Sequence, residues 1–76
     1  MKTSYIGVYD GIATNPDGKS MACWSVYLHI PKTKLLRLFF YRREKLGAWE
    51  KARAEAEKFA RRSRAARGLP QPQGGE

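Results

Sequence analysis

Residues 22–43, ACWSVYLHIPKTKLLRLFFYRR, predict the centre of the fold of this 76-residue chain. Successive side chains of a strand point to opposite faces, so alternation along a sequence predicts a strand with one buried face. Between Met21 and Ile30 one face would carry Ala22, Trp24, Val26 and Leu28, and the other Cys23, Ser25, Tyr27 and His29. We predict that the first face belongs to a core and that the second meets a partner.

The second half of this stretch predicts a hairpin. Residues 31–34, PKTK, are typical of a short polar turn, and residues 35–41 predict the next strand. Alternation places Leu36, Leu38 and either Phe40 or Tyr41 on the core face. It leaves Leu35, Arg37 and Phe39 on the outer face. Three aromatic residues in a row do not alternate, and a bulge there would change which ring is buried.

The residues before this hairpin predict a third, neighbouring strand. Residues 4–12, SYIGVYDGI, carry apolar side chains at Ile6 and Val8 around Gly7. A glycine inside a strand marks either a bulge or a place where another backbone or a ligand comes close. Residues 15–18, NPDG, then meet the requirements of a tight reversal. Strands one and two are therefore expected to pair antiparallel.

The residues after the hairpin predict one amphipathic helix from Ala48 to about Ala66. At helical spacing one face carries Ala48, Trp49, Ala52, Ala56, Phe59, Ala60, Ser63 and Ala66. Trp24, Trp49 and Phe59 are expected in the core, and the arginines from Arg61 to Arg67 in solvent. The fold class is thus α+β, a three-stranded antiparallel sheet packed on one C-terminal helix. Residues 1–67 form one domain, and residues 68–76 have the composition of a disordered tail.

Composition narrows the range of functions. One cysteine and one histidine cannot form an internal disulfide or a metal-ligand set, and no acid–base pair or oriented nucleophile stands out. We expect neither a cofactor nor an enzyme. No apolar run approaches the ~20 residues of a membrane span, and the N-terminus lacks the apolar centre of a signal peptide. A cytoplasmic location is expected, at the nucleoid if the source is bacterial.

The net charge of +8 would draw the chain to polyanions, and it is unevenly distributed. Residues 1–30 sum to zero, residues 31–45 to +5 and residues 46–67 to +4, before Glu76 brings the total back to +8. The positive charge therefore begins at the second turn and continues to the end of the helix.

Several sequence features together resemble the Apetala-two/ethylene-response-factor DNA-binding family, in the versions found outside plants. They are Tyr5-Ile6-Gly7-Val8, Trp24 opening a strand that ends at Pro31, Phe40-Tyr41, Lys45-Leu46-Gly47, and the alanine-spaced helix ending Phe59-Ala60-Arg61. The resemblance implies that the outer sheet face enters the DNA major groove while the helix packs behind. By position it implies contacts from Ile6, Tyr9, Tyr27, His29, Leu35 and Arg37.

The candidate nucleic-acid-binding residues fall into three kinds. Arg37 can donate two hydrogen bonds to a guanine edge, contact a phosphate or stay solvated. Tyr9, Tyr27 and His29 can bond phosphates or bases, although aromatic residues also simply suit strand surfaces. The third kind are cations near strand ends, expected to contact phosphates or form a solvated rim: Lys32, Lys34, Arg42, Arg43 and Lys45.

These observations favour a small double-stranded DNA-binding protein, either a transcriptional regulator or an accessory factor of a mobile element. One alternative is a single-stranded RNA binder that stacks bases on Tyr27 and Phe39. Another is an interaction module or homodimer joined through Leu35, Phe39 and Tyr27 on the outer face. The outer face is aromatic and aliphatic around a single arginine, which favours binding DNA over reading its sequence.

Overall fold

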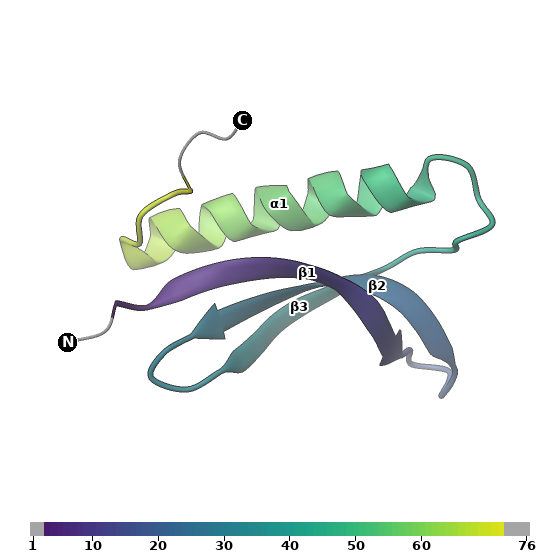
Figure 1. Ribbon diagram of the computed structural model, residues 1–76, viewed down its shortest axis with the longest axis horizontal. Helices are drawn as coiled ribbons and strands as arrows, with labels where there is room; N and C mark the ends of the chain where they lie inside the picture. Colours follow the sequence, from purple (N-terminus) through teal and green to yellow (C-terminus); the bar gives the residue numbers. More distant parts are fainter. Residues whose placement is uncertain (1–2, 73–76) are drawn as a thin grey trace.

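The computed structural model describes residues 3–72 and shows three strands followed by one helix (Figure 1). The elements are β1 (Tyr5–Thr14), β2 (Ser20–His29), β3 (Lys34–Phe40) and α1 (Ala48–Arg67). Both strand pairs are antiparallel, and the sheet order is β1-β2-β3. The predicted fold class is confirmed, and each predicted boundary lies within two residues of the observed one.

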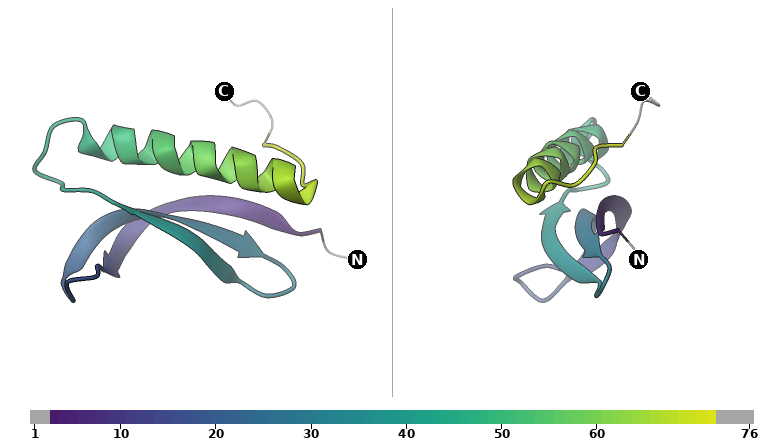
Figure 2. Two further views of the ribbon diagram at one scale, coloured as in Figure 1. Left: turned by 180° about the vertical axis from the view of Figure 1, so that it is seen from behind. Right: turned by 90° about the vertical axis from the view of Figure 1, so that its left-hand side faces the viewer.

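The helix lies along one face of the sheet and leaves the opposite face uncovered (Figures 1 and 2). Val26 at the centre of β2 is 0% exposed, and Ala56 and Ala60 of α1 are equally buried. Alanine carries only a methyl group, so the helix backbone can approach the sheet closely along this stripe. Trp24 is buried as predicted, whereas Phe59 is only partly buried at the margin of the core.

The side chain of Asn15, and not that of Asp17, holds the first hairpin turn together. The Asn15 Oδ1 accepts hydrogen bonds from the backbone N–H groups of Asp17 (2.9 Å) and Lys19 (3.0 Å). The N–H of Gly18 donates to the Asn15 carbonyl oxygen over 2.9 Å and closes the turn. An asparagine side chain thus satisfies two backbone donors within the reversal.

A bulge in β3 overturns part of the predicted alternation. Tyr27 pairs with Leu35 and Val26 pairs with Arg37, so Leu36 is an extra residue in the ladder. Every residue after Leu36 consequently changes face. Arg37 and Phe39 lie on the helix side, where the Phe39 ring stands 5.9 Å from the Phe59 ring, and Tyr41 is the buried aromatic. The placement of Arg37 and Phe39 on the outer face, and of Leu38 in the core, was wrong.

The end of the helix also differs from the prediction. Arg64 is only 6% exposed, and its Nη2 donates to the Ile6 carbonyl oxygen of β1 over 2.8 Å. This arginine is therefore part of the packed interior and not solvated.

Gly68 ends the helix at φ 69°, a left-handed conformation that suits glycine. Leu69 then packs against the core, while residues 73–76 of the predicted tail lie outside the described residues.

A carboxylate joins the far end of the sheet to the start of the helix. Asp10 accepts hydrogen bonds from the Tyr41 hydroxyl and from the Trp49 Nε1, each over 2.9 Å. The Trp49 hydrogen bond is the main cause that lowers the pKa of Asp10, and burial is the main cause that raises the pKa of Tyr41. Trp49 itself is 39% exposed, so it closes the edge of the core instead of filling it.

Candidate nucleic-acid interface

The uncovered face of the sheet carries an aromatic cluster and no charge. Register places Tyr5, Tyr9, Tyr27 and His29 side by side on β1 and β2. Beyond them β3 contributes Leu35, Leu38 and Phe40. Among the described strand residues that register assigns to this face there is no lysine, arginine, aspartate or glutamate. We call it the outer face; any contact it makes must come from ring faces, ring-edge polar atoms and aliphatic groups.

His29 is the centre of the cluster. Its ring stacks on Tyr5 with centroids 4.7 Å apart and planes 27° from parallel. The Tyr9 hydroxyl lies 2.9 Å from the His29 Nε2, and the Thr33 hydroxyl lies 3.4 Å from the Nδ1. Tyr27 stands beside the imidazole with centroids 6.1 Å apart. Because both ring nitrogens have partners, the imidazole is held in one orientation.

Gly7 makes room for this arrangement. The β1–β2 register runs without interruption past Gly7, so the glycine does not mark a bulge. A methyl group built at Gly7 would collide with the phenol ring of Tyr9, which folds across the glycine toward His29. The approaching group is therefore a side chain of the same strand, and not the second backbone or the ligand that the sequence suggested as the alternative to a bulge.

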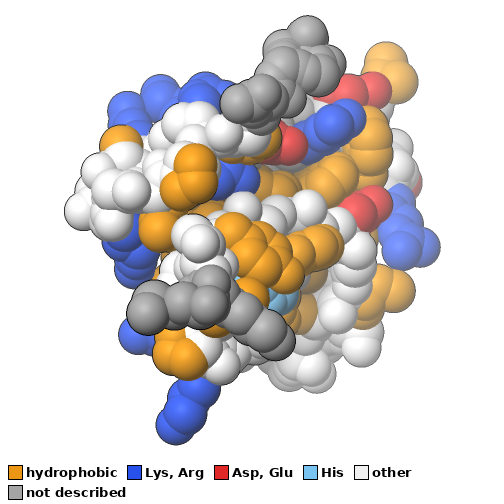
Figure 3. All heavy atoms as spheres, turned by 60° about the vertical axis from the view of Figure 1, so that its left-hand side comes forward, with side chains coloured by type: hydrophobic (Ala, Val, Ile, Leu, Met, Phe, Trp, Pro, Cys, Tyr) orange, Lys and Arg blue, Asp and Glu red, His pale blue; other side chains and the backbone are white. Residues whose placement is uncertain are grey.

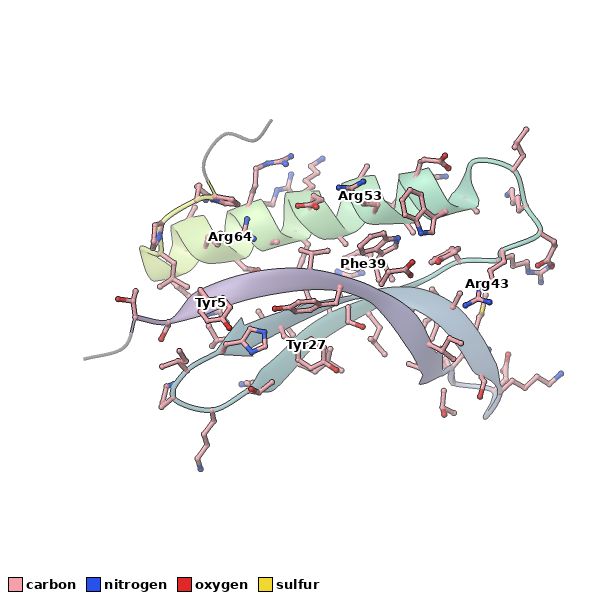
Figure 4. All side chains as sticks on the ribbon, in the orientation of Figure 1. Tyr5, Tyr27, Phe39, Arg43, Arg53 and Arg64 are labelled. Atoms are coloured by element: carbon pink, nitrogen blue, oxygen red, sulfur yellow. The ribbon has the colours of Figure 1, made fainter. Side chains whose placement is uncertain are left out.

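The structure brings three of the nine predicted site residues together and separates the other six from them. Tyr9, Tyr27 and His29 meet on the outer face, with Tyr27 on the side of the sheet away from the helix (Figure 4). Lys32 lies in the exposed turn at one end of that face, and the exposed Lys34 is the first residue of β3. Arg37 instead lies on the helix side, with its guanidinium carbon 5.0 Å from the Phe39 ring centroid and 5.7 Å from that of Phe59.

The three cations after β3 also lie away from the aromatic cluster. Arg42 and Lys45 line a groove between the end of β3 and the first turns of α1, which they share with Lys51. Arg43 lies beside Ile12 and Ser20 at the far end of the sheet (Figure 4). These three cations therefore do not stand on the outer face.

Tyr5 was not among the predicted site residues, although its ring stacks on that of His29. The signal was available, because an antiparallel hairpin turning at residues 15–18 brings the start of β1 opposite the end of β2. The turn of Phe39 toward the helix removes one of the two rings proposed for RNA stacking.

Within residues 3–72, no group of three His, Cys, Asp or Glu side chains is placed to hold a metal ion. No helix in that part of the chain is long and apolar enough to cross a membrane.

Comparisons with known proteins add no relative to this description. A scan against protein-family models finds no match, and neither a curated protein nor a solved structure matches the chain.

Proposed function

We propose that this protein binds double-stranded DNA by laying its outer face against the major groove. The observation that carries the proposal is the uncovered sheet face with its preoriented ring-edge groups, on a chain of net charge +8. The major groove is about 12 Å wide and admits a β-ribbon. The hydroxyls of Tyr9 and Tyr27 and the His29 imidazole can exchange hydrogen bonds with bases or phosphates there.

The turn between β2 and β3 supports this orientation. Lys32 and Lys34 are exposed at the end of the outer face where His29 and Thr33 are joined. Flexible cations at this position would hold the backbone of one DNA strand while the rings meet the groove. The resemblance to the Apetala-two/ethylene-response-factor family supports the same orientation. We propose a regulator of transcription or an accessory factor of a mobile element as the biological role.

Fluorescence anisotropy with labelled duplexes tests this function. Binding should be measurable at about 50 mM salt and should weaken steeply as salt rises, because phosphate contacts release counterions. Tyr27→Thr/His29→Thr should weaken binding. Ile12→Thr is the matched control, since Ile12 is 62% exposed and stands on the other side of β1. Absence of binding at low salt, or equal weakening in both variants, contradicts the proposal.

A second candidate is a homodimer joined through the same face. The specific observation is its lack of charge, together with the exposure of Leu35 (42%) and Tyr5 (48%). Groove-binding surfaces are more basic than this, whereas a patch of aromatic and aliphatic groups suits a protein partner. Oligomeric state in solution separates the two candidates.

A further inference from the structure

A group of exposed cations lies on one side of the molecule, along β3 and the adjoining side of α1. In the right-hand view of Figure 2, β3 lies to the left of β1. In the similar view of Figure 3, most visible Lys and Arg side chains lie on the left and the visible Asp and Glu side chains lie toward the upper right. On the face seen in this view, the positive charge lies mainly toward the β3 edge.

Contacts of the helix fix which stripe of α1 adjoins β3. Trp49 and Arg64 bond to Asp10 and Ile6 of β1, whereas Phe59 packs on Phe39 of β3. Residues three and four apart on a helix share one side. The stripe of Lys51, Glu55, Lys58 and Arg62 consequently runs beside Phe59, on the β3 side.

Three parts of the chain add cations to this side. Lys34 and Arg37 come from β3, and the Arg37 guanidinium reaches the Phe59 ring. Lys45 of the following loop shares a groove with Lys51. We define the basic flank as Lys34, Arg37, Lys45, Lys51, Lys58 and Arg62, all exposed. Glu55 is the one acid on the helical stripe, which leaves the flank with a net charge of +5.

The opposite side of the helix has a different character. The one ion pair found within residues 3–72 joins Arg53 to Glu57 over 3.8 Å, and the Arg53 guanidinium stands over Trp24 and Trp49 near Asp10. There Arg53 is both paired with an acid and used in packing. Among the described residues no cation of the basic flank has an acidic partner within ion-pair distance. Arg37 does pack its guanidinium on Phe39 and Phe59, and this contact leaves its charge unneutralised.

We infer that the basic flank binds the sugar–phosphate backbone of double-stranded DNA, which makes this side the principal source of affinity. The inference rests on the proposed function and assigns it a second surface. Lys51 to Arg62 spans about 17 Å along the helix at 1.5 Å per residue. Along the duplex axis, where one strand carries a phosphate every 3.4 Å, that length corresponds to about five phosphates. Lys34 and Arg37 extend the surface toward the outer face across the free edge of β3.

The chemistry of the flank favours the phosphate backbone over other anions. The cations on its helical stripe stand on a convex helix surface with no exposed aromatic ring between them, so they offer no platform on which unpaired bases could stack. Lysine and arginine on an edge strand also prevent pairing with other sheets. That role concerns Lys34 and Arg37 alone and does not require the matching cations of the helix.

Two triple variants with the same net charge test the inference. The flank variant is Arg37→Gln/Lys58→Gln/Arg62→Gln, and the control is Lys19→Gln/Arg61→Gln/Arg67→Gln; each changes +8 to +5. All six residues are exposed. Anisotropy with one duplex is measured across a salt series. The flank variant should bind at least about 10-fold more weakly, and its slope of log affinity against log salt should become about 3 less steep. The control should stay within about 2-fold of the wild type.

The outcomes separate this inference from the proposed function. Equal weakening in both triple variants shows diffuse attraction and overturns the inference. If Tyr27→Thr/His29→Thr loses binding and the flank variant does not, the inference about the basic flank is overturned and the outer-face function stands. If the flank variant loses binding and Tyr27→Thr/His29→Thr does not, the basic flank is supported and the outer face is rejected as the binding surface. If the wild type binds no duplex, the inference and the proposed function are both rejected. Lys58→Gln/Arg62→Gln alters only the exposed helix surface, and it should still reduce the slope by about 2.

Discussion

Arg64 in the last turns of α1 donates a hydrogen bond from its Nη2 to the carbonyl oxygen of Ile6, 58 residues earlier in the chain and 2.8 Å away. β1 is an edge strand of the sheet, and this contact ties it to the last turns of the helix. The Arg64 Nη1 also lies 3.4 Å from the Gln71 Oε1. One buried guanidinium therefore joins the sheet edge, the helix and the segment that follows it.

Arg64→Met should destabilise the protein. It leaves the Ile6 carbonyl oxygen buried without its donor, which costs about 1–3 kcal/mol of unfolding free energy. For a domain of this size each kcal/mol corresponds to about 4–8 °C in the midpoint of thermal unfolding. Circular dichroism measures this shift. Arg62→Met makes the same change at an exposed position of the same helix, and an equal shift there would contradict the role of Arg64.

Asp10→Asn should reduce stability in a manner that depends on pH. Hydrogen bonds from Trp49 and Tyr41 hold the Asp10 pKa below its ordinary value of 3.8 in the folded protein. The stabilisation by the carboxylate is thus complete above that value and is lost as the pH falls through the lower folded pKa. The difference between wild type and variant should be largest near neutral pH and should narrow below about pH 4.

Urea unfolding at a series of pH values measures this difference. Asp17→Asn, at an exposed turn position, serves as the control and should show no comparable narrowing. Tyr41 makes stability depend on pH in the opposite direction, because its pKa in the folded protein is raised above its ordinary value of 10.0. Its contribution is complete below that value and is lost as the pH rises through the folded pKa.

Gly7→Ala should leave the fold intact and disrupt the aromatic cluster. The new methyl group displaces the Tyr9 ring, so the hydroxyl leaves the His29 Nε2. Replacing a strand glycine gains about 0.5–1 kcal/mol of backbone entropy, which offsets much of the lost contact. Nuclear magnetic resonance should show large shifts for the His29 ring protons with an unfolding midpoint close to that of the wild type. In a Tyr9→Ala background the same Gly7→Ala change should no longer perturb His29.

Leu35→Lys tests the homodimer candidate directly. Leu35 is exposed on the outer face opposite Tyr27, so a lysine there places charge inside any interface formed by that face. If the protein dimerises through this surface, sedimentation should show a concentration-dependent dimer for the wild type and a monomer for the variant. A wild type that stays monomeric at high concentration removes the homodimer candidate.

The sequence allowed the elements and their order to be predicted because local patterns carry that information. Alternation at 22–28 marks β2, the NPDG turn marks the first hairpin, and alanines at helical spacing mark α1. The pairing of the strands follows from the short turns. The meeting of Tyr9, Tyr27 and His29 on one face follows from the same register. The DNA-binding function, by contrast, stays a prediction.

Contacts between residues far apart in the chain set the remaining features of the protein. A single extra residue at Leu36 turns Arg37 and Phe39 toward the helix, because strand side chains alternate with period two and one insertion reverses all that follow. Arg64 looks like any other arginine of a basic helix until the edge carbonyl of Ile6 is placed beside it. Asp10 gains its two donors only when β1, Tyr41 and Trp49 converge. The hairpin at 22–43 was thus enough to predict a sheet with one face against a helix. Contacts between distant residues determined the face on which Arg37 lies and the burial of Arg64.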